Sequence, residues 1–294
     1  MIADRVSNED IIGMLPKRPA ESNKKTFGRV LAVCGSYGMS GAAYLCAKAA
    51  YRSGCGLVEI LTAEENRVIL QTSLPEATVT CYKSDSPDYD TILSAASRAD
   101  AIALGCGLGK NPAAHMVTER LLSAAAVPLV IDADALNIIS EEPRLWGLIH
   151  APVVITPHPA EMSRISRLDI DTILEDTTKA AADFAAERGV VCVLKTHSTA
   201  VTDGSRIYIN TTGNSGMATG GSGDVLAGII ASLLAQQKGR QPLLETAALG
   251  VYIHGLAGDG AAESLGEHSV MASDIINFLP GTIKKIAGKF FENS

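Results

Sequence analysis

The sequence lacks the features that mark secreted and membrane proteins. Its first fifteen residues carry Asp4, Glu9 and Asp10, where a secretory signal needs a basic start followed by an apolar run. Its longest nearly apolar stretch, Val225–Ala235, is far shorter than the roughly 20 residues that span a bilayer. We therefore expect a cytoplasmic protein without a membrane partner, in which Val225–Ala235 is a buried helix.

Positive charge is also scarce. The 294 residues include 25 Lys and Arg against 32 Asp and Glu, which gives a formal net charge of −7. Nucleic acids select strongly basic surfaces, so this balance argues against a nucleic acid as partner. An anionic small ligand would instead need a local positive site.

Metal-binding cysteine patterns are missing too. None of the six cysteines belongs to a Cys-x-x-Cys pair, and none has a histidine at metal-ligand spacing. The six are Cys34, Cys46, Cys55, Cys81, Cys106 and Cys192. Their scatter indicates small buried apolar side chains in a reducing compartment.

Linkers of low complexity, charge blocks and repeats are absent as well, so residues 1–294 are predicted to form a single domain. Short apolar runs alternate with alanine-rich helical patterns, which is typical of a doubly wound, mostly parallel α/β sheet with helices on both faces. The expected strands are Val30–Cys34, Val58–Leu61, Ala101–Leu104, Leu129–Ile131, Val153–Ile155 and Val190–Leu194, and the expected helices are Ala42–Ser53, Ala113–Ala124 and Thr172–Glu187. Ala200–Thr202 and Arg206–Ile209, joined by Asp203-Gly204, predict a hairpin with a two-residue turn and hence an antiparallel edge.

Ligands of an open α/β sheet bind beyond the carboxyl ends of the strands, so the loops that follow the strands are the candidate site. Five loops are unusual: Gly35–Ala43, Gly105–Gly109, Asp132–Asn137, Thr156–Glu161 and Asn214–Leu226. Since parallel strands end at the same edge, these loops are expected to converge.

The last of these loops gives the strongest signal. Gly221, Ser222, Gly223 and Asp224 directly precede a helical pattern, where glycines and free amides make an anion hole for a phosphate. Asp224 falls in the first helical turn, where we expect the carboxylate to stay ionised and to accept the proton of a hydroxyl that attacks phosphorus. For an isolated motif, simple helix capping by Asp224 is the competing interpretation. Asn214, at the start of the loop, is a supporting candidate.

The other loops are ambiguous when taken singly. Gly105–Gly109 suits a pyrophosphate, or is a plain turn, and it is incomplete as a dinucleotide fingerprint. Asp132, Asp134 and Asn137 cluster at one strand end, where they would position a hydroxyl or a hydrated magnesium ion, or else Asp134 caps the helix while Asp132 bonds to loop backbone.

Two further strand ends carry polar candidates. Prolines on both sides of His158 fix the directions of His158 and Glu161, although a histidine is more often structural. Lys195 ends a buried strand, where it needs an anionic partner unless it snorkels at the sheet edge. The polar residues that follow it, Thr196, His197, Ser198 and Thr199, suit a nucleotide's phosphates or ribose.

In combination these motifs are specific. The sequence resembles the NAD(P)H-hydrate dehydratases, the carboxy-terminal domain of YjeF-type proteins, within the ribokinase-like superfamily. The resemblance rests on six motifs in order, which begin with FGRVLAVCGSYGMSGAAYLCAKAAYRSGCGLV, continue with GCGLG, VIDADALN, ITPHPAEM and VLKTHSTAVTDG, and end with GNSGMATGGSGDVLAGIIASLLAQ. Cys106 stands where the family often has proline.

The resemblance implies a function and a set of site residues. Ala43, Gly107 and His158 would line the site for the hydrated nicotinamide nucleotide, the Lys195–Thr199 segment and Gly223 would hold ADP or ATP, and Asp224 would lie between them. It implies dehydration of (6S)-NADHX and (6S)-NADPHX through phosphorylation of the C6 hydroxyl. Magnesium would arrive with the nucleotide, with Glu161 as a guess for an outer contact. A homotetramer is implied as well.

The epimerase domain that many bacterial relatives carry in front is not part of this sequence, so we expect a separate epimerase upstream. Two alternatives remain open. A ribokinase-like vitamin kinase would use the same anion hole but release a stable phosphate ester, and a non-catalytic nucleotide sensor would have no need of Asp224. The motifs fit ADP and ATP equally well as phosphoryl donor. They also fit the hydrates of NADH and NADPH equally well as substrate.

Overall fold

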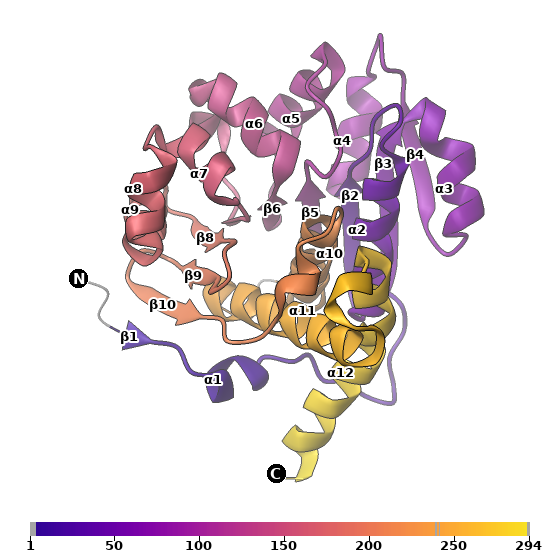
Figure 1. The fold of residues 1–294 in the computed structure, drawn as a ribbon. Helices are drawn as coiled ribbons and strands as arrows, with labels where there is room; N and C mark the ends of the chain where they lie inside the picture. Colours follow the sequence, from indigo (N-terminus) through magenta and orange to yellow (C-terminus); the bar gives the residue numbers. More distant parts are fainter. Residues whose placement is uncertain (1–3, 239, 241, 293–294) are drawn as a thin grey trace.

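The computed structural model describes residues 4–238, 240 and 242–292. Its strands form one sheet in the order β1-β10-β9-β8-β7-β6-β5-β2-β3-β4 (Figure 1). The strands are β1 (Asp4–Arg5), β2 (Arg29–Val33), β3 (Leu57–Ala63), β4 (Thr78–Tyr82), β5 (Ala101–Leu104), β6 (Leu129–Ile131), β7 (Val153–Ile155), β8 (Val191–Leu194), β9 (Ala200–Thr202) and β10 (Arg206–Ile209). The six predicted parallel strands are therefore present, with ends shifted by at most two residues.

Helices cover both faces of the sheet (Figure 1). Alternate residues of β2 show why, since Val30 and Ala32 pack into one core and Leu31 and Val33 into the other. The first face holds α1 (Asn8–Ile12), α2 (Ser40–Arg52), α3 (Arg67–Ser73), α10 (Ser222–Gln237), α11 (Leu243–Leu265) and α12 (Ala272–Glu292). The second holds α4 (Tyr89–Ser97), α5 (Pro112–Ala124), α6 (Ala133–Glu141), α7 (Pro159–Ser166), α8 (Ile170–Glu175) and α9 (Thr177–Arg188).

The predicted antiparallel edge is confirmed. From β8 through β7, β6, β5, β2 and β3 to β4 all neighbours are parallel, whereas β9 is antiparallel to both β8 and β10. The short strand β1, which has no sequence signal, adds in parallel to the outer side of β10.

Two local predictions were wrong. The single helix expected over Thr172–Glu187 is interrupted, because Asp176 leaves the helical conformation and its side chain accepts the Lys179 amide to cap α9. The hairpin turn extends over Asp203–Ser205 rather than over Asp203-Gly204 alone. It is longer because the Asp203 carboxylate accepts the amides of both Ser205 and Arg206.

Helix α10 is the buried helix that the sequence predicts. Every residue of Val225–Ala235 is buried, and α10 packs on α2 and on the centre of the sheet. The approach to α2 is close, since a Cβ atom on Gly228 would lie 2.1 Å from the Cys46 carbonyl oxygen. A search of the described residues finds no helix with the length and apolar character of a bilayer span.

We predict opposite effects for two Gly→Ala substitutions in helices. Gly228→Ala forces a methyl group into the α2 backbone and should lower the free energy of unfolding by ~1–3 kcal/mol. The matched control is Gly281→Ala in α12, where the new methyl group meets open space, and it should raise that free energy by ~0.5–1 kcal/mol. Thermal or urea unfolding measures both, and equal effects would contradict the proposed close contact.

Candidate active site

The predicted loops meet where the carboxyl ends of the parallel strands face the start of α10. Strands β2, β5, β6, β7 and β8 run parallel, so the loops that follow them lie along one edge of the sheet. Helix α10 packs against β2, β5 and β6, which brings its first turn beneath these loops (Figure 1). This is the crevice in which an open α/β sheet binds its ligands.

The first turn of α10 has the form of an anion-binding helix start. Gly221 is the N-cap residue with φ of +90°, a conformation that suits glycine. No acceptor among the described residues bonds the amides of Gly221, Gly223 or Asp224, whereas the Ser222 amide donates to the Thr219 carbonyl at 3.3 Å. Three of the four predicted amide donors are thus free for a ligand.

A buried ion cluster adjoins this turn. The Lys195 ammonium lies 2.8 Å from an Asp132 carboxylate oxygen and 3.8 Å from Glu161, and Asp132 and Glu161 are both buried. A Cβ atom on Gly223 would lie 3.4 Å from Lys195 Nζ, so the ammonium reaches the start of α10. Lys195 therefore has carboxylates of the protein as anionic partners, and it still adds positive charge beside the free amides.

Asp224 faces the same cluster, and the expectation that it stays ionised is wrong for this structure. A carboxylate oxygen of Asp224, a carboxylate oxygen of Asp132 and the sulfur of Cys106 all lie within 4.8 Å of one another. Burial, followed by Cys106 and Asp132, raises the pKa of Asp224 to about 8, and Lys195 opposes this shift only in part. The favourable field of a helix start is smaller than the cost of burying a carboxylate beside another carboxylate.

The pKa values of Glu161 and Lys195, two other members of the buried ion cluster, are raised as well. Burial raises the pKa of Glu161, and Lys195 works against that shift. Burial disfavours the ammonium of Lys195, but Asp132 and Glu161 outweigh it and raise the pKa of Lys195. The cluster therefore combines a firmly protonated lysine with carboxylates that gain protons easily.

The three polar residues after β6 bond to different partners. Asp132 occupies the N-cap position of α6 but its side chain bonds Lys195 instead of capping. Asp134 accepts the Gly109 amide at 2.8 Å, and Asn137 accepts Arg164 Nη1 at 2.9 Å. Asp132 lies close to Asp224, whereas Asp134 and Asn137 bond elsewhere. The alternative in which Asp134 caps the helix and Asp132 bonds loop backbone is therefore wrong. A role of these residues toward a hydroxyl or a hydrated magnesium ion stays a prediction.

His158 and Glu161 form the start of α7. His158 Nδ1 accepts the Ala160 amide at 3.1 Å, and Glu161 in return accepts the His158 amide at 2.8 Å. This reciprocal cap is the structural role that the sequence left open. The His158 side chain is nevertheless 47% exposed, so a ligand can also reach the ring.

Ala43 and Gly107 are both buried. A Cβ atom on Gly107 would lie 2.7 Å from the Ala42 Cβ, and one on Gly35 would lie 3.0 Å from the Ala43 Cβ. Small residues are therefore required for the loops after β2 and β5 to pack on the start of α2. Contact of Ala43 and Gly107 with substrate stays a prediction.

The remaining predicted residues belong to two loops. In Lys195–Thr199, the Thr199 hydroxyl donates to the Thr196 carbonyl at 3.1 Å, while His197 is exposed and Ser198 is partly buried. Asn214 caps a short 3-10 turn by accepting the Gly216 amide and donates to Asp259 of α11 at 3.0 Å. Asn214 thus holds the loop that leads into α10.

Sequence reasoning missed two residues that support this loop. Asp259 also accepts the Gly213 amide at 3.0 Å, and the buried His254 lies 3.3 Å from the Ser222 hydroxyl. Burial lowers the pKa of His254 to about 4, so its ring is neutral. Both residues sit on α11, where a single histidine or aspartate in an apolar helix gives no local signal.

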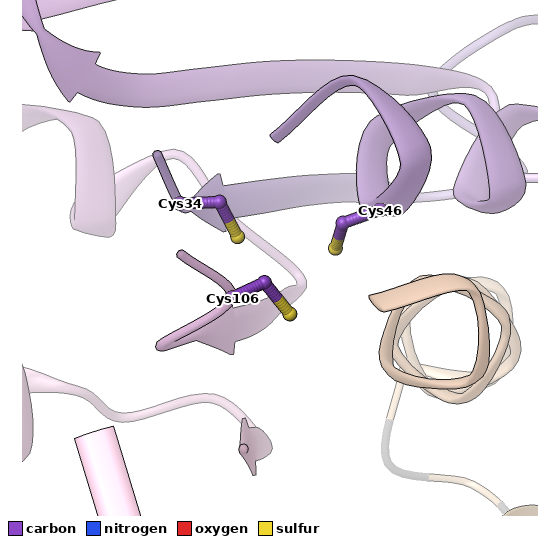
Figure 2. Close-up of side chains that lie close together, drawn as sticks. All are labelled: Cys34, Cys46 and Cys106. Carbon is purple, nitrogen blue, oxygen red and sulfur yellow. The ribbon is translucent and has the colours of Figure 1, made fainter. Parts of the chain in front are cut away.

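The cysteines are less scattered than their spacing indicates. Cys34 follows β2, Cys46 lies on α2 and Cys106 follows β5, and their side chains converge (Figure 2). All three are buried, and their sulfur atoms lie within 4.8 Å of one another. The interpretation as buried apolar residues holds for five of the six, since Cys81 is half-buried.

A cavity of about 510 Å³ lies next to the candidate site rather than on Asp224. Its wall consists of Lys110, Asn137, Ser140, Glu141, Arg164 and Arg167. Lys110 directly follows the Gly105–Gly109 loop. Asn137 lies within α6, so the loop predicted over Asp132–Asn137 is helical from Ala133 onward.

Comparison with known proteins agrees with these features. The NAD(P)H-hydrate dehydratase family matches residues 30–281. The bifunctional NAD(P)H-hydrate repair enzyme of Moorella thermoacetica is 42% identical over 92% of this chain, and the chain spans about half (52%) of that relative's length. The ADP-dependent (S)-NAD(P)H-hydrate dehydratase of Neisseria meningitidis is 40% identical over 85% of this chain and 82% of its own length.

A solved structure extends the agreement to three dimensions. The crystal structure of the ADP/ATP-dependent NAD(P)H-hydrate dehydratase of Bacillus subtilis, co-crystallised with ATP and Mg²⁺, matches with a TM-score of 0.84 and 30% identity over 97% of this chain and 99% of that chain. Sequence and fold lead to the same result: this chain belongs to the NAD(P)H-hydrate dehydratase family.

Proposed function

We propose that the protein dehydrates (6S)-NADHX and (6S)-NADPHX to NADH and NADPH at the expense of ADP or ATP. The observation that carries this proposal is the position of Asp224 in the first turn of α10, beside free amides and the Lys195 ammonium. Such a site binds a phosphoryl group and offers a base to the alcohol that receives it. The names of the relatives support the same reaction.

The first step is phosphoryl transfer. The C6 hydroxyl oxygen of the hydrated ring attacks the terminal phosphorus of ADP or ATP, Asp224 accepts the hydroxyl proton, and AMP or ADP leaves. The amides of Gly221, Gly223 and Asp224 bind the oxygens on which negative charge gathers. Lys195 adds a positive charge next to these donors.

The second step is elimination. Hydroxide leaves poorly, whereas phosphate leaves readily when the lone pair of the ring nitrogen forms a double bond to C6. Loss of a proton from the neighbouring carbon then restores the dihydropyridine ring. The raised pKa of Asp224 suits a group that takes up a proton near neutral pH, since a base works best when its pKa is close to the working pH.

Nucleotide and substrate would occupy opposite sides of Asp224. Lys195–Thr199 and Gly223 would hold the adenine nucleotide, and the loops of Ala43, Gly107 and His158 would hold the hydrated nucleotide. The Asp132 carboxylate fits the preference of magnesium for one or two carboxylates together with phosphates. Magnesium bound there would neutralise phosphate charge.

Several wider predictions belong to this proposal. We propose that residues 1–294 act as one domain in the cytoplasm, that the active form is a homotetramer, and that an epimerase activity converts the R hydrates. The acidic net charge and the sequence motifs support the absence of a nucleic-acid partner.

We predict that enzymatically hydrated NADH regains its dihydronicotinamide absorbance when it is incubated with the protein, Mg²⁺ and ADP. One AMP and one phosphate should appear for each NADH. Replacement of ADP by ATP in parallel reactions establishes the preferred donor. Accumulation of a stable phosphate ester would indicate a kinase instead, and the absence of any nucleotide consumption would refute the proposed reaction.

Asp224→Asn should lower kcat by about 100-fold or more, because the amide cannot accept the hydroxyl proton. Nucleotide binding, measured by calorimetry, should change little, since the helix amides remain. The matched control is Asp171→Asn on the exposed side of α8, which should keep full activity. Unchanged turnover in Asp224→Asn would reject the base and favour a nucleotide sensor.

The rate should rise with pH. The base must be deprotonated, and with a pKa of about 8 only about a tenth of Asp224 is deprotonated at pH 7. We therefore expect kcat/KM to increase about tenfold per pH unit below pH 8 and to level off above it. Measurements of kcat/KM between pH 6 and 9.5 test this, and a profile that is flat across this range would show that Asp224 titrates elsewhere.

A further inference from the structure

The three converging cysteines have an arrangement that buried apolar packing does not require. They come from three separate elements, are each completely buried, and bring their sulfur atoms within 4.8 Å of one another (Figure 2). Alanine or valine would fill a core equally well, whereas three mutually close thiols form a set of donor atoms. The dehydration reaction described above uses none of them.

We propose that Cys34, Cys46 and Cys106 form a binding site for one thiophilic d¹⁰ cation, such as Cu⁺, Zn²⁺ or Cd²⁺. Thiolates select these ions over magnesium and calcium, which prefer oxygen. Metal–sulfur bonds of about 2.3 Å place neighbouring sulfur atoms about 3.8 Å apart. Sulfur atoms within 4.8 Å of one another need to move by at most about 1 Å to meet that geometry.

Metal binding replaces the thiol protons of the cluster. A thiolate is the form of cysteine that binds metals. Binding then forms three metal–sulfur bonds and releases one proton to solvent from each cysteine that was still a neutral thiol.

The cysteine cluster adjoins the active site through Cys106. This residue also belongs to the group of Cys106, Asp132 and Asp224, whose carboxylate oxygens and sulfur lie within 4.8 Å of one another. Asp224 is partly exposed, so we infer that an ion meets the carboxylates first and reaches the sulfur atoms from there.

A metal ion in the cysteine cluster would affect the proposed reaction through Cys106. The Cys106 sulfur lies 4.0 Å from an Asp132 carboxylate oxygen and within 4.8 Å of an Asp224 carboxylate oxygen. A metal ion on that sulfur replaces its proton and alters the surroundings of both carboxylates. Thiophilic ions should therefore change the rate of turnover, although their binding to the cluster does not depend on the proposed reaction.

The test is a titration of the reduced, full-length protein with Cd²⁺ in the presence of a competing chelator. Cadmium is chosen because thiolate ligands give it a charge-transfer absorbance in the ultraviolet. We expect one tightly bound Cd²⁺ per chain with that absorbance. The chelator keeps the isolated, half-exposed thiol of Cys81 from contributing.

The site variant is Cys46→Ala, because Cys46 has no role in the proposed reaction. The matched control is Cys192→Ala, because Cys192 is equally buried but lies outside the cluster. Cys46→Ala should weaken Cd²⁺ binding by more than about tenfold, since loss of a supporting partner alone costs roughly 10–100-fold. Cys192→Ala should bind as the parent protein does. Circular dichroism verifies folding, and Cys34→Ala replaces Cys46→Ala if the latter unfolds.

Three results would overturn the proposal. They are the absence of stoichiometric binding, binding without the thiolate absorbance, and equal affinities of Cys46→Ala and the parent protein. Binding without the absorbance would assign the ion to the carboxylates of Asp132 and Asp224. Because the titration involves no substrate, its outcome is independent of whether hydrated NADH is the substrate.

Discussion

The close packing of α10 on α2 is the constraint on which the site depends. At Gly228 the two helices approach so closely that a methyl group would overlap the Cys46 carbonyl. This contact, together with the packing of α10 on β2, β5 and β6, fixes where the first turn of α10 lies. The free amides and Asp224 are therefore held at the carboxyl ends of the strands by helix packing, with no flexible segment in between.

The features that depend on a local sequence pattern were predicted correctly from the sequence. Strands such as Ala101–Leu104 and the buried run Val225–Ala235 follow from runs of apolar residues, and the glycines before Asp224 follow from the needs of an anion hole. The features that could not be predicted from the sequence depend on the directions in which side chains point. The sequence places Asp132 and Asp134 two residues apart, but the bend at the start of α6 sends one to Lys195 and the other to Gly109.

The same limit explains the charge state of Asp224. Position in the first turn of a helix predicts an ionised carboxylate, and that part of the argument is local. Burial and the nearness of Cys106 and Asp132 come from distant parts of the chain, and they dominate. Asp259 and His254 were missed for a related reason, since from another helix Asp259 contacts the loop before α10 and His254 contacts the first residue of α10.

The cap on α7 also fixes the chemistry of one imidazole. Since His158 Nδ1 accepts the Ala160 amide, the neutral ring must carry its hydrogen on Nε2. That nitrogen is then a donor, and it lies 3.5 Å from the Glu161 carboxylate of the same cap. Because the helix terminus imposes the tautomer, any group that approached Nε2 would have to be an acceptor that shares this hydrogen with Glu161 or takes it over.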